Sequence, residues 1–198
     1  MREQVIRPIR PRVRPADPHA AESLAALLGR EIAAAGHAGC PATIICVGTD
    51  RSTGDALGPL VGTLLEQRHI PGLQVFGSLR APVHAGNLTE FLPTLLEVAS
   101  QGPVLAVDAC LGNYESVGSV LVQQGPLRPG AGVRKELPPI GDVAVMATVN
   151  VGGFMEYVVL QNTRLSLVYD LAVLIADSVG LCFSSAARPR AGEPLPRQ

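Results

Sequence analysis

The chain has 198 residues, 47% of them apolar and only 17% charged, with a formal net charge of −1. This length suits one domain with a substantial core, and the composition is typical of a soluble α/β protein. It argues against a membrane protein, because charged residues interrupt the longest apolar region, 151–181, and a buried helix explains that region better.

Strand-like and helix-like segments alternate along the chain. An Ala- and Leu-rich helix at 20–35 precedes a strand at 43–47 and a helix at 57–69. A strand at 73–78 follows, then a helix at 88–99 that is capped by Asn87, and strands at 103–107 and 117–124. A Gly- and Pro-rich loop at 125–141 leads to a strand at 143–147 and to a last helix from about 151 or 153 to 179. Such alternation predicts a three-layer α/β/α sandwich with a mixed, mostly parallel sheet. Strands 43–47 and 103–107 should be interior and parallel.

Both ends of the chain are basic and rich in proline. Residues 1–15 hold five arginines, and residues 184–198 hold three. We predict disordered tails at 1–18 and 184–198 around a single domain at 19–183. An Arg-Pro tail can contact nucleic acid, but solvated disordered ends are the better interpretation, and we expect neither a nucleic-acid nor a membrane partner.

The N-terminus lacks the apolar segment of a signal peptide, which predicts a cytoplasmic protein. Its four cysteines should then be reduced thiols. None forms a Cys-x-x-Cys pair, so the cysteines do not suggest a zinc site. We expect no cofactor and no tight metal site, although Asp55, Asp108 and His84 leave a weak divalent site open. The four cysteines are Cys40, Cys46, Cys110 and Cys182.

The segment 46–59, CVGTDRSTGDALGP, is the most informative part of the chain. The buried strand 43–47 stops at Gly48, and a loop of small and polar residues then leads into a helix. This loop holds Asp50, Arg51 and Asp55. The strand 103–107 likewise ends in Asp108. Ligands bind beyond the carboxyl ends of parallel strands, so Asp55 and Asp108 are predicted to form one site.

Two neighbouring carboxylates can share a proton, one acting as base on water and the other as acid. Structural alternatives exist for each. Asp55 precedes a helix and could cap it, and Asp108 could simply end its strand. Two aspartates at two strand ends favour a catalytic pair over two separate structural roles.

Three further residues are candidates for the same edge of the sheet. His84 follows the second strand, and Asn150 follows the strand at 143–147, so both could line the crevice with Asp50 and Arg51 and bind substrate. A Cys110–His84 pair would be a nucleophile with its base. For Cys110 we favour a small buried residue, and for Cys46 a place in the core. Walker A, dinucleotide-binding and Gly-x-Ser-x-Gly motifs are absent.

Several segments together resemble a family of small sporulation proteins from spore-forming Firmicutes that is named as a spore protease family. The resemblance covers about residues 40–180 and includes 48–59, PVH at 82–84, DACLG at 108–112, PGAG at 129–132, LPPIGD at 137–142 and NVGGFMEYVVLQNTRL at 150–165. This family is similar to the germination protease, which degrades small acid-soluble spore proteins. It is more distantly similar to the hydrogenase maturation endopeptidases.

The resemblance implies an aspartate pair at Asp55 and Asp108. In the hydrogenase endopeptidases these positions bind nickel together with a histidine from a later loop. The corresponding residues 136–143 contain no histidine, so an acid pair without metal is the better expectation. The implied fold is that of the hydrogenase maturation peptidases. The implied partner is a spore protein, with small acid-soluble spore proteins as candidates.

Two hypotheses of function follow. In the first, the protein is an aspartate-dependent endopeptidase acting in the forespore or mother-cell cytoplasm. In the second, it keeps the peptidase fold but binds or assembles other sporulation proteins, using the segment 152–157 as an interface. Either protein could form a homo-oligomer.

Overall fold

The fold was analysed in a computed structural model, which describes residues 11–37, 41–99, 101–129 and 138–186. Six strands form one sheet in the order β1-β5-β6-β4-β2-β3. Strands β2 (Ala42–Cys46), β3 (Leu73–Phe76), β4 (Val104–Gly112) and β6 (Val143–Val151) are parallel to one another. Strands β5 (Ser119–Gln124) and β1 (Arg12–Val13) add two antiparallel pairings.

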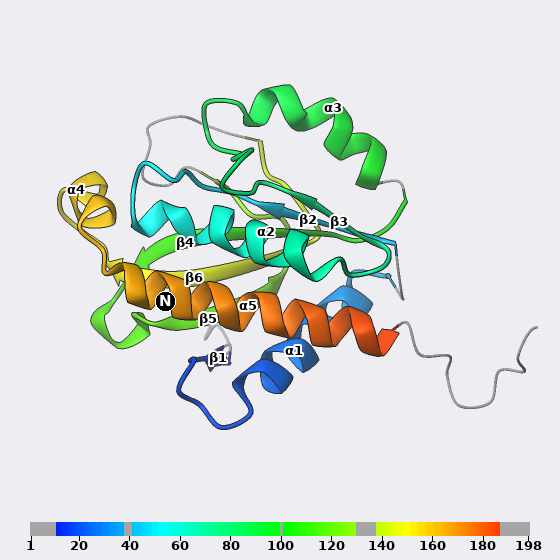
Figure 1. Ribbon diagram of the computed structural model, residues 1–198, viewed down its shortest axis with the longest axis horizontal. Coiled ribbons are helices and arrows are strands. Elements are labelled where there is room, and N and C mark those ends of the chain that lie inside the picture. The colour runs from blue at the N-terminus through cyan, green and yellow to red at the C-terminus, as the bar shows by residue number, and fades with distance from the viewer. Residues whose placement is uncertain (1–10, 38–40, 100, 130–137, 187–198) are drawn as a thin grey trace, which may run out of the picture.

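Helices cover both faces of the sheet (Figure 1). Helices α1 (Ala20–Ala34), α2 (Leu57–Arg68) and α5 (Leu165–Ala186) lie on one face, where their apolar stripes form the larger core with β2, β4 and β6. Helix α3 (Leu88–Ala99) covers part of the other face over a smaller core. The predicted three-layer α/β/α sandwich is therefore confirmed, and β2 and β4 are interior parallel strands as expected.

Two strands are longer than the sequence predicted. We expected strands at 103–107 and 143–147, but β4 extends to Gly112 and β6 to Val151. The pairing of β4 with β6 continues through Asp108 and Cys110 up to an irregularity after Cys110. Cross-strand hydrogen bonds therefore hold residues 108–112 in an extended conformation, although their composition is typical of a turn. Asp108 lies within a strand rather than at its end.

The predicted single helix from about 151 or 153 to 179 is instead two helices. Helix α4 (Glu156–Gln161) is separated from α5 by 162–164. Asn162 ends α4, and the buried Thr163 is held by a side-chain contact with Asn150. Asn and Thr compete with helical hydrogen bonds through their own side chains, which explains a break at this position.

The predicted N-terminal tail is wrong for residues 11–18. Arg12 and Val13 pair with Leu121 and Val120 of β5, and Val13 is buried in the larger core. Asp17 closes the following turn by accepting a hydrogen bond from the Arg14 amide. Residues 1–10 and 187–198, and 130–137 of the predicted loop 125–141, lie outside the described residues, whereas 184–186 belong to α5.

Among the described residues, one helix is long and apolar enough by length and composition to cross a membrane, at Leu165–Ser184 within α5. In the fold this helix packs against α1 and α2. Its inward side chains are fully buried, as expected for the core helix of a globular domain: Val168, Leu171, Ala172, Ile175, Ala176 and Val179.

Candidate functional site

Asp55 is positioned by a tight connection between β2 and α2. It lies in a 3-10 turn, η1 (Gly54–Ala56), which leads directly into α2. The Thr49 amide donates to the Asp55 carbonyl over 3.2 Å, which folds the loop back on the end of β2. A side chain at Gly48 would place its Cβ 2.0 Å from that carbonyl oxygen, and φ of Gly48 is +147°. The approach of η1 to β2 therefore requires glycine at this position.

Asp108 reaches the same edge of the sheet from the neighbouring strand. Cys46 pairs with Val107, so Asp108 lies level with Val47 at the end of β2. Val107 and Ala109 face the larger core, and alternation turns Asp108 toward the opposite face, where α3 lies. The two aspartates predicted from the sequence are thus brought together by the register of adjacent parallel strands.

The charge of Asp55 acts on the carboxyl group of Asp108. Burial, together with this nearby charge, raises the pKa of Asp108 to about 8, although a hydrogen bond from the Ala109 amide lowers it. Asp108 keeps some solvent-accessible surface but is closely surrounded by protein atoms. Burial also raises the pKa of Asp55, against a lowering contribution from Ser52. At neutral pH the pair is expected to hold a proton.

The structure does not support the alternative in which Asp55 caps a helix. Neither η1 nor α2 has a side-chain hydrogen bond at its N-cap. Next to Asp55 lies Ser52, whose buried Oγ has no hydrogen-bond partner among the described residues. The Ser52 hydroxyl thus approaches the Asp55 carboxyl without a hydrogen bond of good geometry. A buried hydroxyl beside a carboxylate can hold a water molecule.

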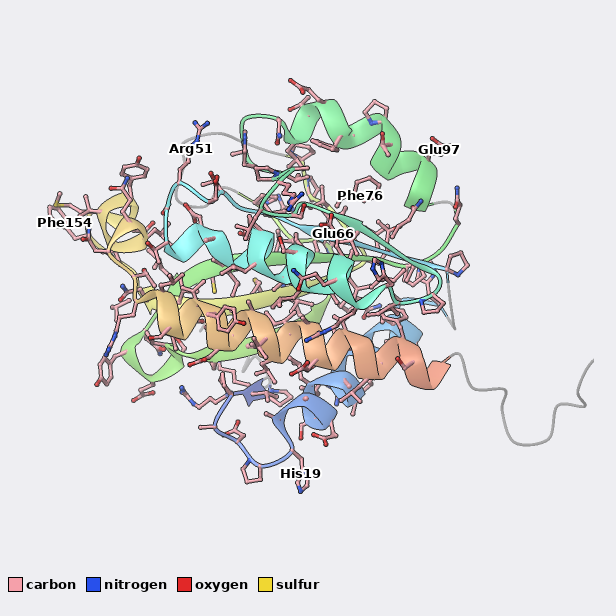
Figure 2. The ribbon with its side chains drawn as sticks, viewed as in Figure 1. His19, Arg51, Glu66, Phe76, Glu97 and Phe154 are labelled. Carbon is pink, nitrogen blue, oxygen red and sulfur yellow. The ribbon has the colours of Figure 1, made fainter. Side chains whose placement is uncertain are left out.

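The four predicted substrate-binding residues lie at this end of the molecule but differ in their surroundings. Asp50 and Arg51 are exposed, and Figure 2 shows Arg51 pointing outward at the same end as Phe154. His84 follows Val83, which bridges to Val47 on the side of β2 opposite β4. Its Nδ1 accepts a hydrogen bond from the Gly86 amide.

Asn150 has a structural contact that the sequence did not indicate. Its Nδ2 donates to Thr163 Oγ1 over 3.2 Å and points toward the Val159 carbonyl at 3.5 Å. Its Oδ1 accepts from the Val151 amide. The side chain thus ties β6 to α4 and to the segment before α5.

The Cys110–His84 pair does not form among the described contacts. Cys110 lies on β4 and contacts Thr148 of β6 at 3.5 Å, whereas His84 lies beyond the other side of β2. Burial raises the pKa of the Cys110 thiol, with a smaller raising contribution from Asp108, while Thr148 and Arg12 lower it. A thiol with a raised pKa is a poor nucleophile. Cys46 is buried in the core, as expected, whereas Cys40 lies outside the described residues.

Asn87 also differs from its predicted role. Its side chain accepts from the His84 amide and donates to the Pro82 carbonyl. It therefore orders the loop before α3 instead of satisfying the helix itself. This loop holds the backbone of His84 against the end of β2, where the Gly48 amide donates to the Val83 carbonyl over 2.8 Å.

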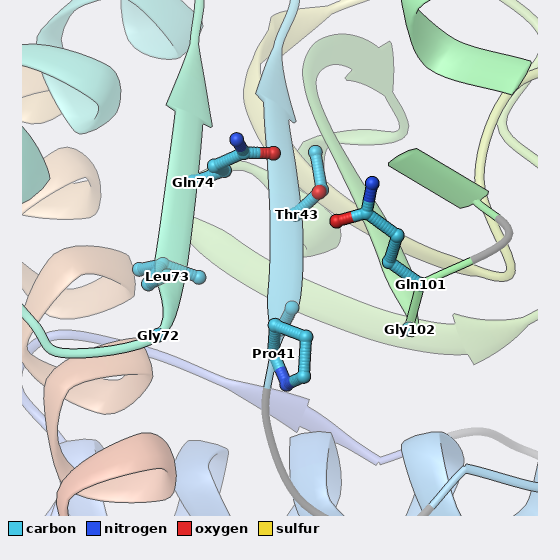
Figure 3. A pocket seen from close by; sticks show the side chains of 8 residues that line it. Pro41, Thr43, Gly72, Leu73, Gln74, Gln101 and Gly102 are labelled. Carbon is cyan, nitrogen blue, oxygen red and sulfur yellow. The ribbon is translucent and has the colours of Figure 1, made fainter. Parts of the chain in front are cut away.

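Two recesses of the described surface contain neither of the two aspartates. One, of about 270 Å³, lies at the amino ends of β2 and β3 and is lined by uncharged residues such as Thr43, Gln74 and Gln101 (Figure 3). The other, of about 570 Å³, lies between β6 and α4 and includes Asn150, Phe154 and Met155. Neither contains a titratable side chain, so the chemistry of the acid pair marks the candidate site.

The residues present do not fit the nickel site implied by the resemblance. Within the described residues, no cluster of three or more His, Cys, Asp or Glu side chains could hold a metal ion. Two carboxylates supply only oxygen donors, and the later loop contributes no histidine. Nickel usually takes imidazole nitrogen ligands in addition to oxygen.

Comparison with known proteins assigns the family. Residues 12–178 match the profile of DUF1256, described as a protein of unknown function. The chain belongs to this family. The chain is also similar to YyaC of Bacillus subtilis (strain 168), which is described as an uncharacterized protein. This DUF1256 chain is 45% identical to YyaC over 181 residues, which is 91% of the chain and 87% of YyaC.

The DUF1256 fold is shared with a solved peptidase structure. The [NiFe] hydrogenase maturation protease HycI from Thermococcus kodakarensis KOD1 superposes with a TM-score of 0.54 at 15% identity. The match covers 80% of this chain and 99% of HycI. At this identity the likeness shows the fold, and it agrees with the sandwich predicted from the sequence.

Proposed function

We propose that this DUF1256 protein is an endopeptidase that hydrolyses a peptide bond with Asp55 and Asp108. The observation that carries the proposal is the raised pKa of Asp108, about 8, beside a second aspartate with a raised pKa. Perturbed carboxyl pairs at the carboxyl edge of a parallel sheet are typical of functional sites. The peptidase-like fold supports this reaction class over others.

The difference between the two carboxyl groups assigns their roles. Asp108 holds its proton at neutral pH and acts as the general acid. Asp55, as carboxylate, takes a proton from a water molecule that attacks the peptide carbonyl carbon. Asp108 then gives its proton to the leaving amine as the carbon–nitrogen bond breaks, and the acid proton of the new carboxyl is lost to solvent. The proton that Asp55 took from the water passes to Asp108, which restores the pair. The unpartnered Ser52 hydroxyl is available to hold the attacking water.

The resemblance in the sequence suggests the biological setting. We place the protein in the cytoplasm of a forespore or mother cell, acting on a spore protein, with small acid-soluble spore proteins as the first candidates. Asp50, Arg51 and His84 lie around the same edge and are proposed to contact the substrate chain. Asn150 contributes by holding α4.

The decisive experiment is incubation of the purified protein with small acid-soluble spore proteins, followed by sequencing of the fragments. We expect Asp55→Asn and Asp108→Asn to lower the cleavage rate by roughly 10²–10⁴-fold, because asparagine can neither accept nor donate the catalytic proton. Asp170→Asn, at an exposed position on α5 outside the site, is the matched control. Cleavage that persists in both site variants would contradict the acid-pair mechanism.

A second candidate function, a binding or assembly factor, is favoured by one observation. Phe154, Met155 and Tyr157 are 84%, 58% and 62% exposed at the start of α4. Exposed large apolar side chains in one segment are typical of protein interaction surfaces. If no spore protein is cleaved while Phe154→Ser weakens capture of one, this function replaces the peptidase.

A further inference from the structure

Arg12 lies on the same face of the sheet as Asp108, although β1 and β4 are three strand positions apart. Its Nη1 donates to Ser119 Oγ of β5 and to Thr148 Oγ1 of β6, each over 3.2 Å. Thr148 in turn contacts Cys110 of β4, two residues beyond Asp108. A continuous row of polar side chains therefore leads from Arg12 to the acid pair.

The hydrogen bonds fix the guanidinium and leave part of it free to bind. Ser119 and Thr148 are 0% and 1% exposed, so the two hydroxyls form a rigid anchor. Ser119 Oγ donates to the Ser116 carbonyl and can therefore only accept from Arg12. The two hydrogens of Nη1 satisfy these two hydroxyls. The three hydrogens on Nη2 and Nε have no partner in the contacts of the described residues.

Arg12 also has no counter-charge within the part of the chain that the structure describes. The ion pairs of the described residues do not include it. Nη1 anchors the guanidinium, and Nη2 and Nε form its remaining edge. This edge can bind a carboxylate through two parallel hydrogen bonds.

We propose that Arg12 is a carboxylate-binding site that selects substrates of the acid pair. The ligand is the carboxylate of an acidic side chain or of a chain end. Cys110 lies roughly 7 Å from Asp108 along β4. Arg12 Nη1 is separated from Cys110 by Thr148 Oγ1, through contacts of 3.2 Å and 3.5 Å. A carboxylate bound by Arg12 therefore lies within about three or four extended residues of a peptide bond held at Asp108. The statement that this ligand is a substrate rests on the proposed function. The binding of a carboxylate by Arg12 does not.

The test uses the full chain, labelled with ¹⁵N, and three peptides. These are acetyl-AAEAA-amide, acetyl-AAQAA-amide and acetyl-AAQAA with a free carboxyl end. We expect a peptide with a carboxylate to shift the Arg12 Nε resonance and the amides of Ser119, Leu121 and Thr148. The peptide without a carboxylate should not. The Glu peptide and the free-acid peptide separate the side chain from the chain end as the source of the carboxylate.

Variants separate binding from a role in holding β1. Arg12→Gln should weaken binding of the carboxylate peptide by about 10- to 100-fold, the range for hydrogen bonds to a charged group. Arg12→Lys keeps the charge but not the paired hydrogen bonds, so it should bind the carboxylate peptide weakly. This second variant keeps the proposal testable if Arg12→Gln does not fold. Arg30→Gln, on α1, removes the same charge on the other side of the sheet and should bind like the parent.

Equal binding of the Glu and Gln peptides, no shift from any peptide, or undiminished binding by Arg12→Lys and a folded Arg12→Gln would overturn the proposal. Failure of the proposed function looks different. In that case carboxylate peptides still bind in an Arg12-dependent manner, but no spore protein is cleaved. Conversely, cleavage that needs both aspartates and ignores Arg12 would refute only the carboxylate site.

Discussion

Leu160 packs directly against the backbone of Gly54, so helix α4 supports the turn that carries Asp55. A Cβ at position 54 would lie 2.8 Å from Leu160 Cδ2 and 3.0 Å from the Leu160 carbonyl oxygen. There is thus no room for even a methyl group between η1 and α4. The position of Asp55 is coupled to the position of α4 through this contact.

Gly54→Ala should therefore lower both stability and cleavage. Forcing a methyl group into a filled contact typically costs about 1–3 kcal/mol of unfolding free energy. A displacement of Asp55 by about 1 Å would lower the cleavage rate on the order of 10²-fold. Chemical denaturation and a cleavage assay measure the two effects.

A double variant and a control make the assignment specific. Gly54→Ala with Leu160→Ala should recover part of the lost activity, because the Cδ2 contact is removed while the carbonyl contact remains. Gly29→Ala is the matched control, since its new Cβ would meet only Cys182 Sγ at 3.9 Å. An active, stable Gly54→Ala would show that η1 and α4 are not coupled.

Asn150→Ala tests whether Asn150 positions α4 or contacts substrate. Loss of the hydrogen bond to Thr163 should lower the unfolding free energy by about 1 kcal/mol. Because α4 supports η1, the catalytic rate constant should fall while KM changes little. Asn162→Ala, which removes an exposed amide bonded to the Val158 carbonyl, serves as control. A rise in KM at unchanged stability would favour direct substrate contact instead.

Asp55 and Asp108 could be predicted from the sequence because the local pattern of each strand and the expected order of strands in the sheet point to the same edge. The β-branched run at 43–47 and the Gly-rich loop after it identified β2 and Asp55, and strand alternation placed Asp108 on the next strand. The roles of other residues depend on pairing that no local pattern encodes. The length of β4 is set by β6, and DACLG at 108–112 has the composition of a turn.

Arg12 was missed for the same reason. In the sequence it is one of several arginines in a Pro-rich segment, which predicted a disordered tail. Only its pairing with Leu121 of β5 carries its side chain across the sheet. The alternation of the short segment Arg12-Val13, with one apolar residue, is too brief to identify a strand. Buried hydroxyls at Ser119 and Thr148 were equally invisible before the strands were placed.

Cys110→Ser should leave cleavage largely intact, because water rather than the thiol is the proposed nucleophile. Burial raises the pKa of the Cys110 thiol, so alkylation by iodoacetamide at neutral pH should be slower than for a model thiol. Mass spectrometry of the alkylated protein measures this. An inactive Cys110→Ser combined with fast alkylation would identify a cysteine peptidase.

Removal of metal should not alter the protein. The acid pair provides two carboxylates without a third ligand among the described residues, so we expect cleavage to be unchanged after dialysis against EDTA. Nickel and zinc measured by plasma emission should be far below one equivalent in the purified protein. Stoichiometric nickel, lost together with activity on dialysis and restored with it, would contradict the metal-free mechanism.

Asp108→Asn should remove activity and yet stabilise the protein at alkaline pH. The folded pKa of Asp108 is about 8, against an ordinary value of 3.8, so between these pH values the folded state binds more protons than the unfolded state. The contribution of Asp108 to stability is fully present below about pH 4, falls by up to about 1.4 kcal/mol per pH unit, and is lost above pH 8. The raised pKa of Asp55 acts in the same direction.

Asparagine cannot ionise, so the variant should lose less stability than the parent between pH 5 and pH 8, as measured by urea denaturation at each pH. The parent's cleavage rate should decline as pH rises through about 8, because the general acid loses its proton there. Asp170→Asn, which changes an exposed carboxylate on α5, should follow the parent in both measurements. If Asp108→Asn instead destabilises the protein at pH 8, the Asp108 carboxylate is stabilised by the fold, and the shared-proton site is wrong.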